Sequence, residues 1–364
     1  MPVAASAAGA APINASGMEH RVAVTMKDVA RLAKVSVATV SRVLNSSAPV
    51  RADTSARVLE IARELRFSPN GAARTLKRRQ ASALGVILPD LYGEFFSELL
   101  RGIDLEAQRA GHALLVSSSH HDAHGVSIAV RAMRGRVDGL LVMAPEVSSA
   151  SLATALPDGL PTVILNTAST AGAAAAVTVD NMGGTRVVVH HLAALGHQLV
   201  AFLCGPSRNA DAAARLRGYR TAMRAAGLIV HESLVLRGDF TEQGGWLAAR
   251  ALIASDGPRP TALFAANDAM AVGALLALHE SGIDVPGDIS VVGFDDIPIA
   301  RYVTPSLTTV RVAIDVLGAR AAALLFRALT DPMMQGYGHR EVIPAELLIR
   351  QSCGPPPAAA TARR

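Results

Sequence analysis

Cysteine is scarce in this 364-residue chain, which contains only Cys204 and Cys353. The two thiols lie far apart in the sequence, each within or beside an apolar run, and this predicts reduced cysteines and not a disulfide framework. No apolar run reaches the length that spans a bilayer. The sequence therefore favours a cytoplasmic protein with no membrane partner over a disulfide-bonded secreted domain or a membrane protein.

Motifs of several large enzyme classes are also missing. No G-x-G-x-x-G follows an apolar run, and neither a G-x-S-x-G turn nor a phosphate-binding P-loop is present. A metal site is conceivable, because His120, His121 and His124 lie close to Asp122 in the sequence. Without a second cluster, however, imidazoles in a polar segment more often face solvent. We therefore expect no catalytic residue, no metal and no cofactor.

Both ends of the chain, residues 1–24 and 351–364, are predicted to be disordered tails. The first is rich in alanine and is interrupted by Pro2, Gly9 and Pro12. It also lacks the basic leading segment and clean apolar stretch of a secretory signal. Half of all residues are apolar, so the chain between the tails can bury the core of a small module and a large domain.

Two short helices joined by a turn are predicted directly after the first tail. Thr25 and Asp28 have the spacing of a capping box for the first helix. After the tight connection Lys34-Val35, Ser36 can cap the second helix. With a third helix downstream, this pattern predicts a helix-turn-helix module. The apolar side chains expected to pack the first two helices together are Val29, Ala30, Leu32, Ala33, Val40, Val43 and Leu44.

The opposite face of the second helix is left for a partner. Arg42 can pair bidentately with guanine in the major groove of DNA, and Val37 and Ala38 can contact thymine methyl groups. Two amphipathic helices joined by a turn also occur in many helical cores, so the pattern alone is not decisive. The residues predicted to contact DNA are Thr25, Ser36, Val37, Ala38, Thr39, Ser41, Arg42 and Asn45.

The distribution of charge separates these two interpretations. Residues 25–80 contain 12 Lys and Arg against 4 Asp and Glu, a net charge of +8. The whole chain carries only +5 and residues 1–24 are balanced, so residues 81–364 sum to −3. A positive field confined to one end supplies the salt-sensitive part of DNA affinity. The charge therefore favours a DNA-binding module.

Residues 24–33 and 35–45 resemble the DNA-binding headpiece of the lactose and galactose repressor family (LacI/GalR). The resemblance continues through residues 67–76, which are similar to the hinge helix of that family, expected here over about 69–78. It implies that this helix lies in the minor groove, with Leu76 wedged into a base step and Ala73 near the groove floor. The alternative for Leu76 is an ordinary linker leucine. The hinge residues expected to contact DNA are Asn70, Ala73, Arg74 and Leu76.

After residue 80, short apolar runs alternate with amphipathic stretches, which is typical of βαβ units. Nearly continuous apolar strands predict parallel sheets covered on both faces, and about nine strands favour two doubly wound subdomains over one sheet. The expected strands are Ala83–Leu88, Ala113–Ser117, Gly139–Met143, Thr162–Leu165, Ala176–Val179, Leu199–Leu203, Leu234–Leu236, Ala262–Ala265 and Ile289–Gly293. The expected helices between them include Phe95–Ala110, Gly183–Leu195, Ala212–Ala226, Gln243–Ala254 and Ala269–Glu280.

Polar residues follow most of these strands. Ligands of doubly wound sheets bind outside the carboxyl ends of the strands. Carboxylates and amides there can bind vicinal hydroxyl groups, and an aromatic ring can cover the C–H face of a sugar. A single polar residue could equally end a strand or cap a helix, but their joint placement predicts a sugar-type site. The polar candidates include Asp90, Ser118, Ser119, Asn166, Arg215, Asp239, Asn267, Asp268, Asp295 and Asp296, and the aromatic candidates are Tyr92, Phe95, Phe96 and Phe240.

This body also resembles the effector domain of the same family, in motifs such as residues 266–268 and 282–296. The resemblance implies a periplasmic-binding-protein-like body over residues 81–350. Its N-subdomain would comprise residues 81–179 and 313–343, and its C-subdomain residues 180–312 and 344–350. Gly93-Glu94 stands where many members have Asn-Pro, which leaves the identity of the effector open. The residues expected to contact the effector are Asp90, Phe95, Phe96, Asn166, Arg215, Phe240, Asn267 and Asp295.

Together these features predict an α/β transcription regulator with a helical headpiece, most simply a repressor of carbohydrate-utilisation genes. A sugar-type effector between the subdomains would control its affinity for a palindromic operator in double-stranded DNA. A homodimer is expected, because two headpieces on a two-fold axis read a palindrome. The apolar helix predicted over Ile314–Leu329 could pack internally or against a second subunit. The alternatives are a periplasmic-type sugar-binding protein, which the DNA module disfavours, and a doubly wound enzyme, which the missing motifs disfavour.

Overall fold

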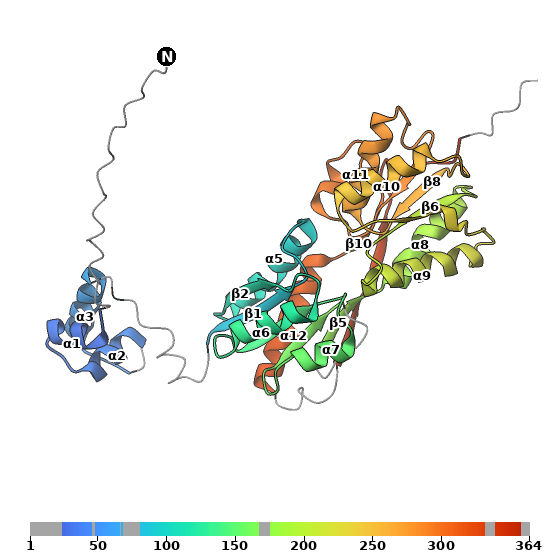
Figure 1. Ribbon diagram of the computed structural model, residues 1–364. Coiled ribbons are helices and arrows are strands. Elements are labelled where there is room, and N and C mark those ends of the chain that lie inside the picture. The colour runs from blue at the N-terminus through green and yellow to red at the C-terminus, as the bar shows by residue number, and fades with distance from the viewer. Residues whose placement is uncertain are drawn as a thin grey trace, which may run out of the picture. The chain divides into compact units, whose positions relative to one another are not determined.

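Two compact units divide the chain, Met1–Arg79 and Gln80–Arg364 (Figure 1). The predicted hinge residues Asn70, Ala73, Arg74 and Leu76 lie outside the part of the chain that the structure describes. The computed structural model describes residues 24–45, 48–65, 67, 81–166, 175–331 and 339–357.

In its described residues the first unit consists of three helices, and we call this part the headpiece. Thr25 donates from its backbone nitrogen and from Oγ1 to the Asp28 carboxylate, at 3.0 and 2.7 Å. Ser36 Oγ accepts from the backbone nitrogen of Thr39 at 3.1 Å, so both predicted caps are present. The helices are α1 Met26–Ala33, α2 Val37–Asn45 and α3 Ala52–Glu64. Their core consists of Val29, Ala30, Ala33, Val40, Val58 and Ala62.

One residue of the predicted headpiece core is not buried. Leu32 is 48% exposed, although it lies next to the buried Ala33 on α1. A helix of eight residues has room for only a narrow apolar stripe, and α2 and α3 cover that stripe without reaching Leu32. The prediction for Leu32 was therefore wrong.

The second unit begins with a six-stranded sheet in the order β11-β5-β4-β3-β1-β2, in which every pair is parallel. Alternate residues of β1 enter different cores: Leu84 packs with Leu99 of α5, whereas Ile87 packs with Val126 of α6. Helices thus cover both faces, and we call this sheet with its helices the N-subdomain. The strands are β1 Ala83–Leu88, β2 Ala113–Ser118, β3 Gly139–Met143, β4 Thr162–Leu165, β5 Ala175–Val179 and β11 His339–Ile343, and the helices are α5 Glu94–Arg109, α6 Ala123–Met133, α7 Ser149–Ala155 and α12 Ile314–Thr330.

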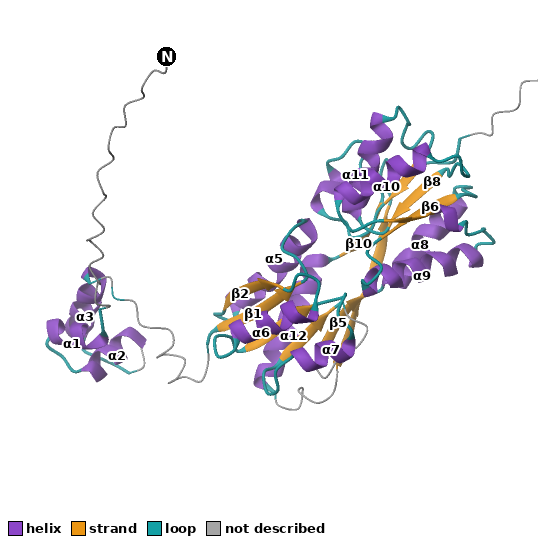
Figure 2. Ribbon diagram, viewed as in Figure 1, coloured by secondary structure: helices purple, strands orange, loops and turns teal. Residues whose placement is uncertain are grey.

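A four-stranded parallel sheet in the order β7-β6-β8-β9 forms the C-subdomain, with α8 and α9 on one face and α10 and α11 on the other (Figures 1 and 2). The predicted architecture of two doubly wound parallel-sheet subdomains is confirmed. The strands are β6 Val200–Cys204, β7 Val235–Arg237, β8 Ala262–Ala265 and β9 Ser290–Val292. The helices are α8 Asn181–Ala194, α9 Ala210–Ala225, α10 Glu242–Ala254 and α11 Asp268–Glu280, with the short 3-10 turns η1 Glu232–Leu234 and η2 Pro298–Arg301.

The chain passes between the two subdomains in segments that lie close together. The strands β10 Thr309–Val312 and β12 Ala345–Leu348 form an antiparallel pair of their own, and β10 is drawn between the two sheets in Figure 1. The backbone nitrogen of Asp180, just after β5, donates to Ile343 O at 3.0 Å. The helix α12 packs internally against α5 and against the strands β3, β4 and β5, which is one of the two packings considered for it.

The predicted disordered tail at 351–364 needs correction. Ser352 is fully buried, and its Oγ accepts from Thr308 N at 2.8 Å and donates to Val291 O at 2.6 Å. Gly354 O accepts a hydrogen bond from the ring of His197, a residue that is 1% exposed. Residues 351–357 are therefore packed against the C-subdomain despite their proline content, and residues 358–364 lie outside the described residues. Of the helices in the described ranges, none has the length and apolar character needed to cross a bilayer.

Candidate functional sites

The exposed face of α2 carries the side chains predicted to read DNA. Ala38 and Arg42 are exposed and Val37 is 42% exposed. Because Val40 on the opposite face is fully buried in the headpiece core, this face is held rigidly toward solvent. Thr25 and Ser36 are exposed and Thr39 and Ser41 are half-buried, while Asn45 is the last residue of α2.

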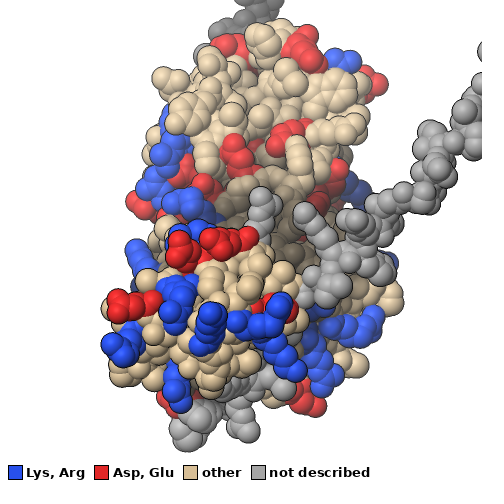
Figure 3. Space-filling view, turned by 90° about the vertical axis from the view of Figure 1, so that its left-hand side faces the viewer, with Lys and Arg blue, Asp and Glu red and all other residues tan. Residues whose placement is uncertain are grey.

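Positive charge surrounds this face. All Lys and Arg side chains of the headpiece that the structure describes are exposed, namely Lys27, Arg31, Lys34, Arg42, Arg51, Arg57 and Arg63. Figure 3 draws Lys and Arg side chains in blue on one face of the molecule, where many of them reach the surface. Exposed cations keep their hydration and can neutralise phosphates without any change in the core.

A cavity between the two subdomains gathers side chains from distant parts of the sequence. All eight residues predicted to contact an effector line it: Asp90, Phe95, Phe96, Asn166, Arg215, Phe240, Asn267 and Asp295. The cavity and its mouth contain about 1040 Å³ that no protein atom fills. Part of this space is open solvent at the mouth, so the cavity itself is smaller.

Arg215 is the centre of the polar network at the base of the cavity, although only 4% of it is exposed. Its Nε donates to Asn181 Oδ1 at 2.8 Å, its Nη1 to Ala266 O at 2.5 Å and its Nη2 to Asp295 Oδ1 at 2.9 Å. The guanidinium also lies 3.8 Å from the centroid of the Phe294 ring. These contacts fix the guanidinium plane and leave its remaining N–H groups for a ligand.

Two buried carboxyl groups beside Arg215 hold protons more tightly than usual. Burial raises the pKa of Asp211 to about 6, against the opposing effect of the Arg215 charge. Burial likewise raises the pKa of Asp295 to about 6, again opposed by Arg215. Both groups are charged for the most part at neutral pH and titrate just below it.

Several cavity residues have a backbone conformation that non-glycine residues seldom adopt. The φ angle is 49° at Asn166, 70° at Phe240 and 112° at Asp295. Such conformations persist where the surroundings impose them, and they concentrate at functional sites. Gly205 makes room for one of these residues, since a Cβ added there would lie 2.3 Å from the Phe240 ring.

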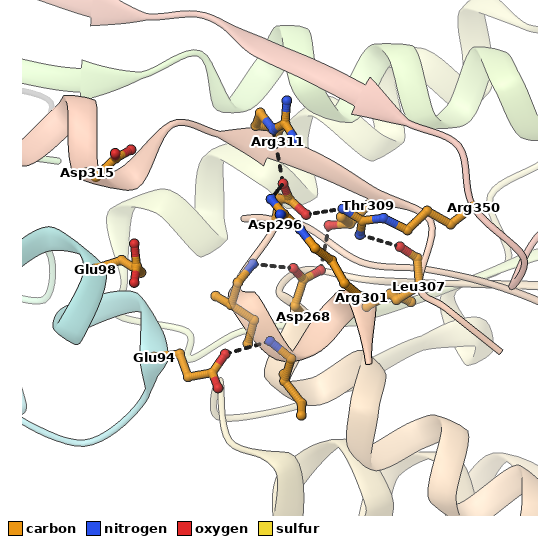
Figure 4. A network of polar contacts seen from close by, with 12 residues as sticks. Glu94, Glu98, Asp268, Asp296, Arg301, Leu307, Thr309, Arg311, Asp315 and Arg350 are labelled. Carbon is orange, nitrogen blue, oxygen red and sulfur yellow. Dashed lines mark hydrogen bonds and ion pairs between the residues drawn. The ribbon is translucent and has the colours of Figure 1, made fainter. Parts of the chain in front are cut away.

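The loop that carries Asp295 is held by a second network, seen in Figure 4. Asp268 is fully buried and accepts from Thr309 Oγ1 at 2.5 Å and from Ile297 N at 2.9 Å. The carboxylate of Asp296 accepts from Arg311 and also from Arg350. Asp268 and Asp296 therefore support the cavity from behind and are not part of its lining.

Hydrogen bonds cross the cavity from one subdomain to the other. Glu146, which follows β3, accepts from Asn209 Nδ2 at 2.7 Å, and Asn209 in turn caps α9. Glu94 at the start of α5 accepts from the backbone nitrogen of Ile299 in η2 at 2.8 Å. At the mouth, Tyr92 donates to Glu242 at 3.4 Å. The relative position of the subdomains thus depends on residues that also line the cavity.

The sequence analysis did not name six polar residues of these networks as site candidates: Glu94, Glu146, Asn181, Asn209, Asp211 and Glu242. The signal for Glu146 was present, because it lies three residues after β3 and polar residues near the other strand ends were inspected. Asn181 and Asp211 lie in the first turns of helices, where an Asn or an Asp is also an ordinary choice. Only their burial beside Arg215 distinguishes them.

Several other candidates from the sequence analysis lie outside the cavity lining. Ser118 is the last residue of the edge strand β2 and Ser119 follows it, and both donate to backbone carbonyls at the end of β1, outside the cavity lining. Asp122 accepts from Gly125 N at 2.6 Å and caps α6. His121 does line the cavity, 3.4 Å from Glu146. Within the described residues, no group of three or more His, Cys, Asp or Glu side chains could hold a metal ion.

Comparison with known proteins adds to this geometry. Residues 25–70 match the sequence model for bacterial regulatory proteins of the lacI family, and residues 189–353 match that of a periplasmic binding protein-like domain. The ribose operon repressor of Escherichia coli (strain K12) is 37% identical over 314 residues, which cover 85% of this chain and 94% of that protein.

Solved structures give a similar result. The lac repressor dimer bound to operator and the anti-inducer ONPF has a TM-score of 0.79 and 30% identity to this chain, covering 90% of this chain and 98% of the other. A LacI family transcriptional regulator from Enterococcus faecium with bound ribose has a TM-score of 0.67 and 28% identity, covering 75% of this chain and 99% of the other.

Proposed function

This chain belongs to the LacI family of bacterial regulatory proteins, and we propose that it is a dimeric repressor whose affinity for a palindromic operator is controlled by a sugar-type effector. One observation carries the proposal. Eight side chains expected at an effector site, drawn from both subdomains, line a single cavity in a chain that also presents a basic helix-turn-helix face. The relatives include the ribose operon repressor, so D-ribose is the first effector to test.

Control of DNA binding follows from where the effector would sit. A ligand held by Asn166 of the N-subdomain and by Arg215 and Asp295 of the C-subdomain favours one relative position of the two. If the headpieces of a dimer can engage the operator in only one such position, the ligand changes operator affinity by linkage. The size of the change is limited by the difference between the ligand's affinities for the two states.

A dimer also accounts for apolar side chains that the second unit leaves exposed. Leu115 and Val116 are 39% and 40% exposed on the edge strand β2, and Leu247 and Leu276 are 53% and 52% exposed on the neighbouring helices α10 and α11. Exposed apolar edges of this kind usually have a partner. We assign them to a second copy of the chain, because reading a palindrome requires two headpieces.

Neither rival function accounts for all of these features. A periplasmic sugar-binding protein has no use for a basic helix-turn-helix face, and the relatives compared above are transcription regulators. An enzyme would need a nucleophile or an acid and base placed against a substrate, whereas the polar groups at the base of this cavity are held in pairs around Arg215. We therefore infer a non-enzymatic, cytoplasmic regulator.

Selection of DNA by the purified full chain tests this function. A library of random duplexes should yield a palindromic consensus, and D-ribose or another sugar should change the affinity for that consensus in a gel-shift titration. Sedimentation should show a dimer. A library that yields no consensus, or a consensus whose affinity no sugar alters, would contradict the operator and the effector parts of the proposal respectively.

A further inference from the structure

We propose that this cavity selects an uncharged, polyhydroxylated effector whose hydroxyl groups donate to Glu146 and Asn166, and that it excludes phosphorylated and carboxylated sugars. The inference rests on the proposed role of the cavity as the effector site. It goes further, because the proposed function names a sugar-type effector without specifying its charge.

The charge of the lining is the first argument. Seven carboxyl groups line the cavity: Asp90, Glu94, Glu146, Asp211, Asp239, Glu242 and Asp295. Arg215 is the one Arg or Lys among the described lining residues. An anionic ligand would therefore enter a field of its own sign, which water screens least beside the largely buried carboxyl groups of Glu146 and Asp295.

Arg215 does not offset this field for a ligand. It forms an ion pair with Asp295 at 2.9 Å, and Asp211 lies close enough for its pKa to be lowered by the Arg215 charge. A phosphate or carboxylate could bind Arg215 only by competing with a carboxylate that is already 95% buried there. The guanidinium can instead donate to the neutral oxygen of a hydroxyl group.

Two buried acceptors without partners are the second and independent argument. Glu146 Oε2 and Asn166 Oδ1 have no hydrogen-bond partner among the residues that the structure describes. Both are buried, since the side chain of Glu146 is 8% exposed and Asn166 is 2% exposed. Both residues line the cavity. A buried acceptor left unpaired is costly, so both atoms are suited to receive donors from a ligand. Hydroxyl groups supply such donors, so these two atoms favour a polyhydroxylated ligand, and the exclusion of anionic sugars rests on the carboxyl groups of the lining.

Glu146 is placed to determine specificity because its two oxygens have different tasks. Oε1 accepts from Asn209 across the cavity at 2.7 Å, which fixes the carboxylate, and Oε2 is left for the ligand. A hydroxyl group bound at Oε2 would therefore be held by a charge-assisted hydrogen bond at the contact between the subdomains.

Matched pairs of sugars test the charge selection. The thermal stability of the full chain at pH 7 is measured with D-ribose against D-ribose 5-phosphate and with D-galactose against D-galacturonate, and the affinity of each sugar that binds is then measured by calorimetry. We expect an uncharged member to bind, and its anionic partner to bind roughly a hundredfold more weakly. An anionic member that binds as tightly as its uncharged partner overturns the inference and leaves the proposed repressor function intact. Binding by neither series, in a chain that still selects a palindrome, overturns both the inference and the effector part of the proposal.

Glu146→Gln tests the specificity residue itself. Glutamine keeps an oxygen for Asn209 but replaces the charged acceptor at Oε2, so the affinity for the uncharged sugar should fall about tenfold. Glu346→Gln, an exposed change on β12 outside the cavity lining, is the matched control and should bind normally. Urea unfolding shows whether both variants fold as the parent does. Equal sugar affinity of folded Glu146→Gln and the parent would contradict the role of Glu146.

Discussion

The headpiece and the body differ in where their recognition side chains lie relative to the core. In the headpiece, six buried residues form the core, and the described side chains predicted to contact DNA lie outside it, either exposed or half-buried. In the body, functional groups such as Arg215 and Asp295 are themselves buried and bonded to one another. Exposed recognition side chains can be replaced without changing the fold of the headpiece, whereas the buried side chains of the cavity also stabilise the body. The following predictions test this difference, from the largest expected effect to the smallest.

Salt should weaken DNA binding by the headpiece far more than sugar binding by the body. The exposed cations of the headpiece predict that affinity for DNA falls by about 10³-fold between 50 and 200 mM salt, as expected for six or more phosphate contacts. Binding of an uncharged sugar in the body releases no such counterions and should change less than about twofold. Parallel titrations of a labelled duplex and of the sugar measure both slopes, and similar slopes would remove the distinction.

Arg215→Met should cost the body about 3–5 kcal/mol of unfolding free energy, because it leaves Asp295 and the acceptors Asn181 Oδ1 and Ala266 O buried without their donor. Arg109→Met is the matched control, since Arg109 pairs with Glu106 while its side chain is 71% exposed, and it should cost less than about 1 kcal/mol. Urea unfolding measures both. Equal losses would mean that the cavity network is not structural.

Arg42→Ala should change the discrimination between DNA sequences and leave the stability nearly unchanged. Stability should stay within about 0.5 kcal/mol of the parent, because the side chain is exposed. Discrimination at one base pair of the operator should fall by about 1–3 kcal/mol. Arg63→Ala on α3 removes an equally exposed charge away from the reading face and should weaken all duplexes alike. Competition between the selected duplex and its single-base variants distinguishes the two, and unchanged discrimination would refute base reading by Arg42.

Acidity should weaken effector binding. Burial raises the pKa of Asp211 and Asp295 to about 6, so between about pH 6 and the ordinary carboxyl pKa of 3.8 the folded protein binds protons that the unfolded chain does not. Burying these two groups in the charged form destabilises the folded state, and this destabilisation is fully present above pH 6. It is relieved as the pH falls through that window. A hydroxyl group that donates to a carboxylate favours its charged form. The affinity for the effector should fall up to about tenfold from pH 7 to pH 5, and calorimetry at both values detects it.

The sequence is more informative about the headpiece than about the body for a physical reason. The caps at Thr25 and Ser36 and the reading face of α2 depend on residues a few positions apart, so local spacing predicts them. In the body, the end of a predicted strand pointed to Asp295 and the family resemblance pointed to Arg215, but their pairing needs the fold. Glu146 lies near a strand end and could have been found there, whereas its bond to Asn209 and the packing of residues 351–357 depend on contacts with distant segments. The wedge at Leu76 stays a prediction.

Linkage between the two regions is the central claim, and one titration tests it directly. The full chain is bound to its selected palindrome, labelled with a fluorophore, and the anisotropy is followed as the sugar found by the matched-pair screen is added, with a scrambled duplex as reference. The account predicts that saturating sugar shifts the dissociation constant for the palindrome by at least about fivefold and leaves that for the scrambled duplex unchanged. A palindrome affinity that is the same with and without bound sugar would contradict it.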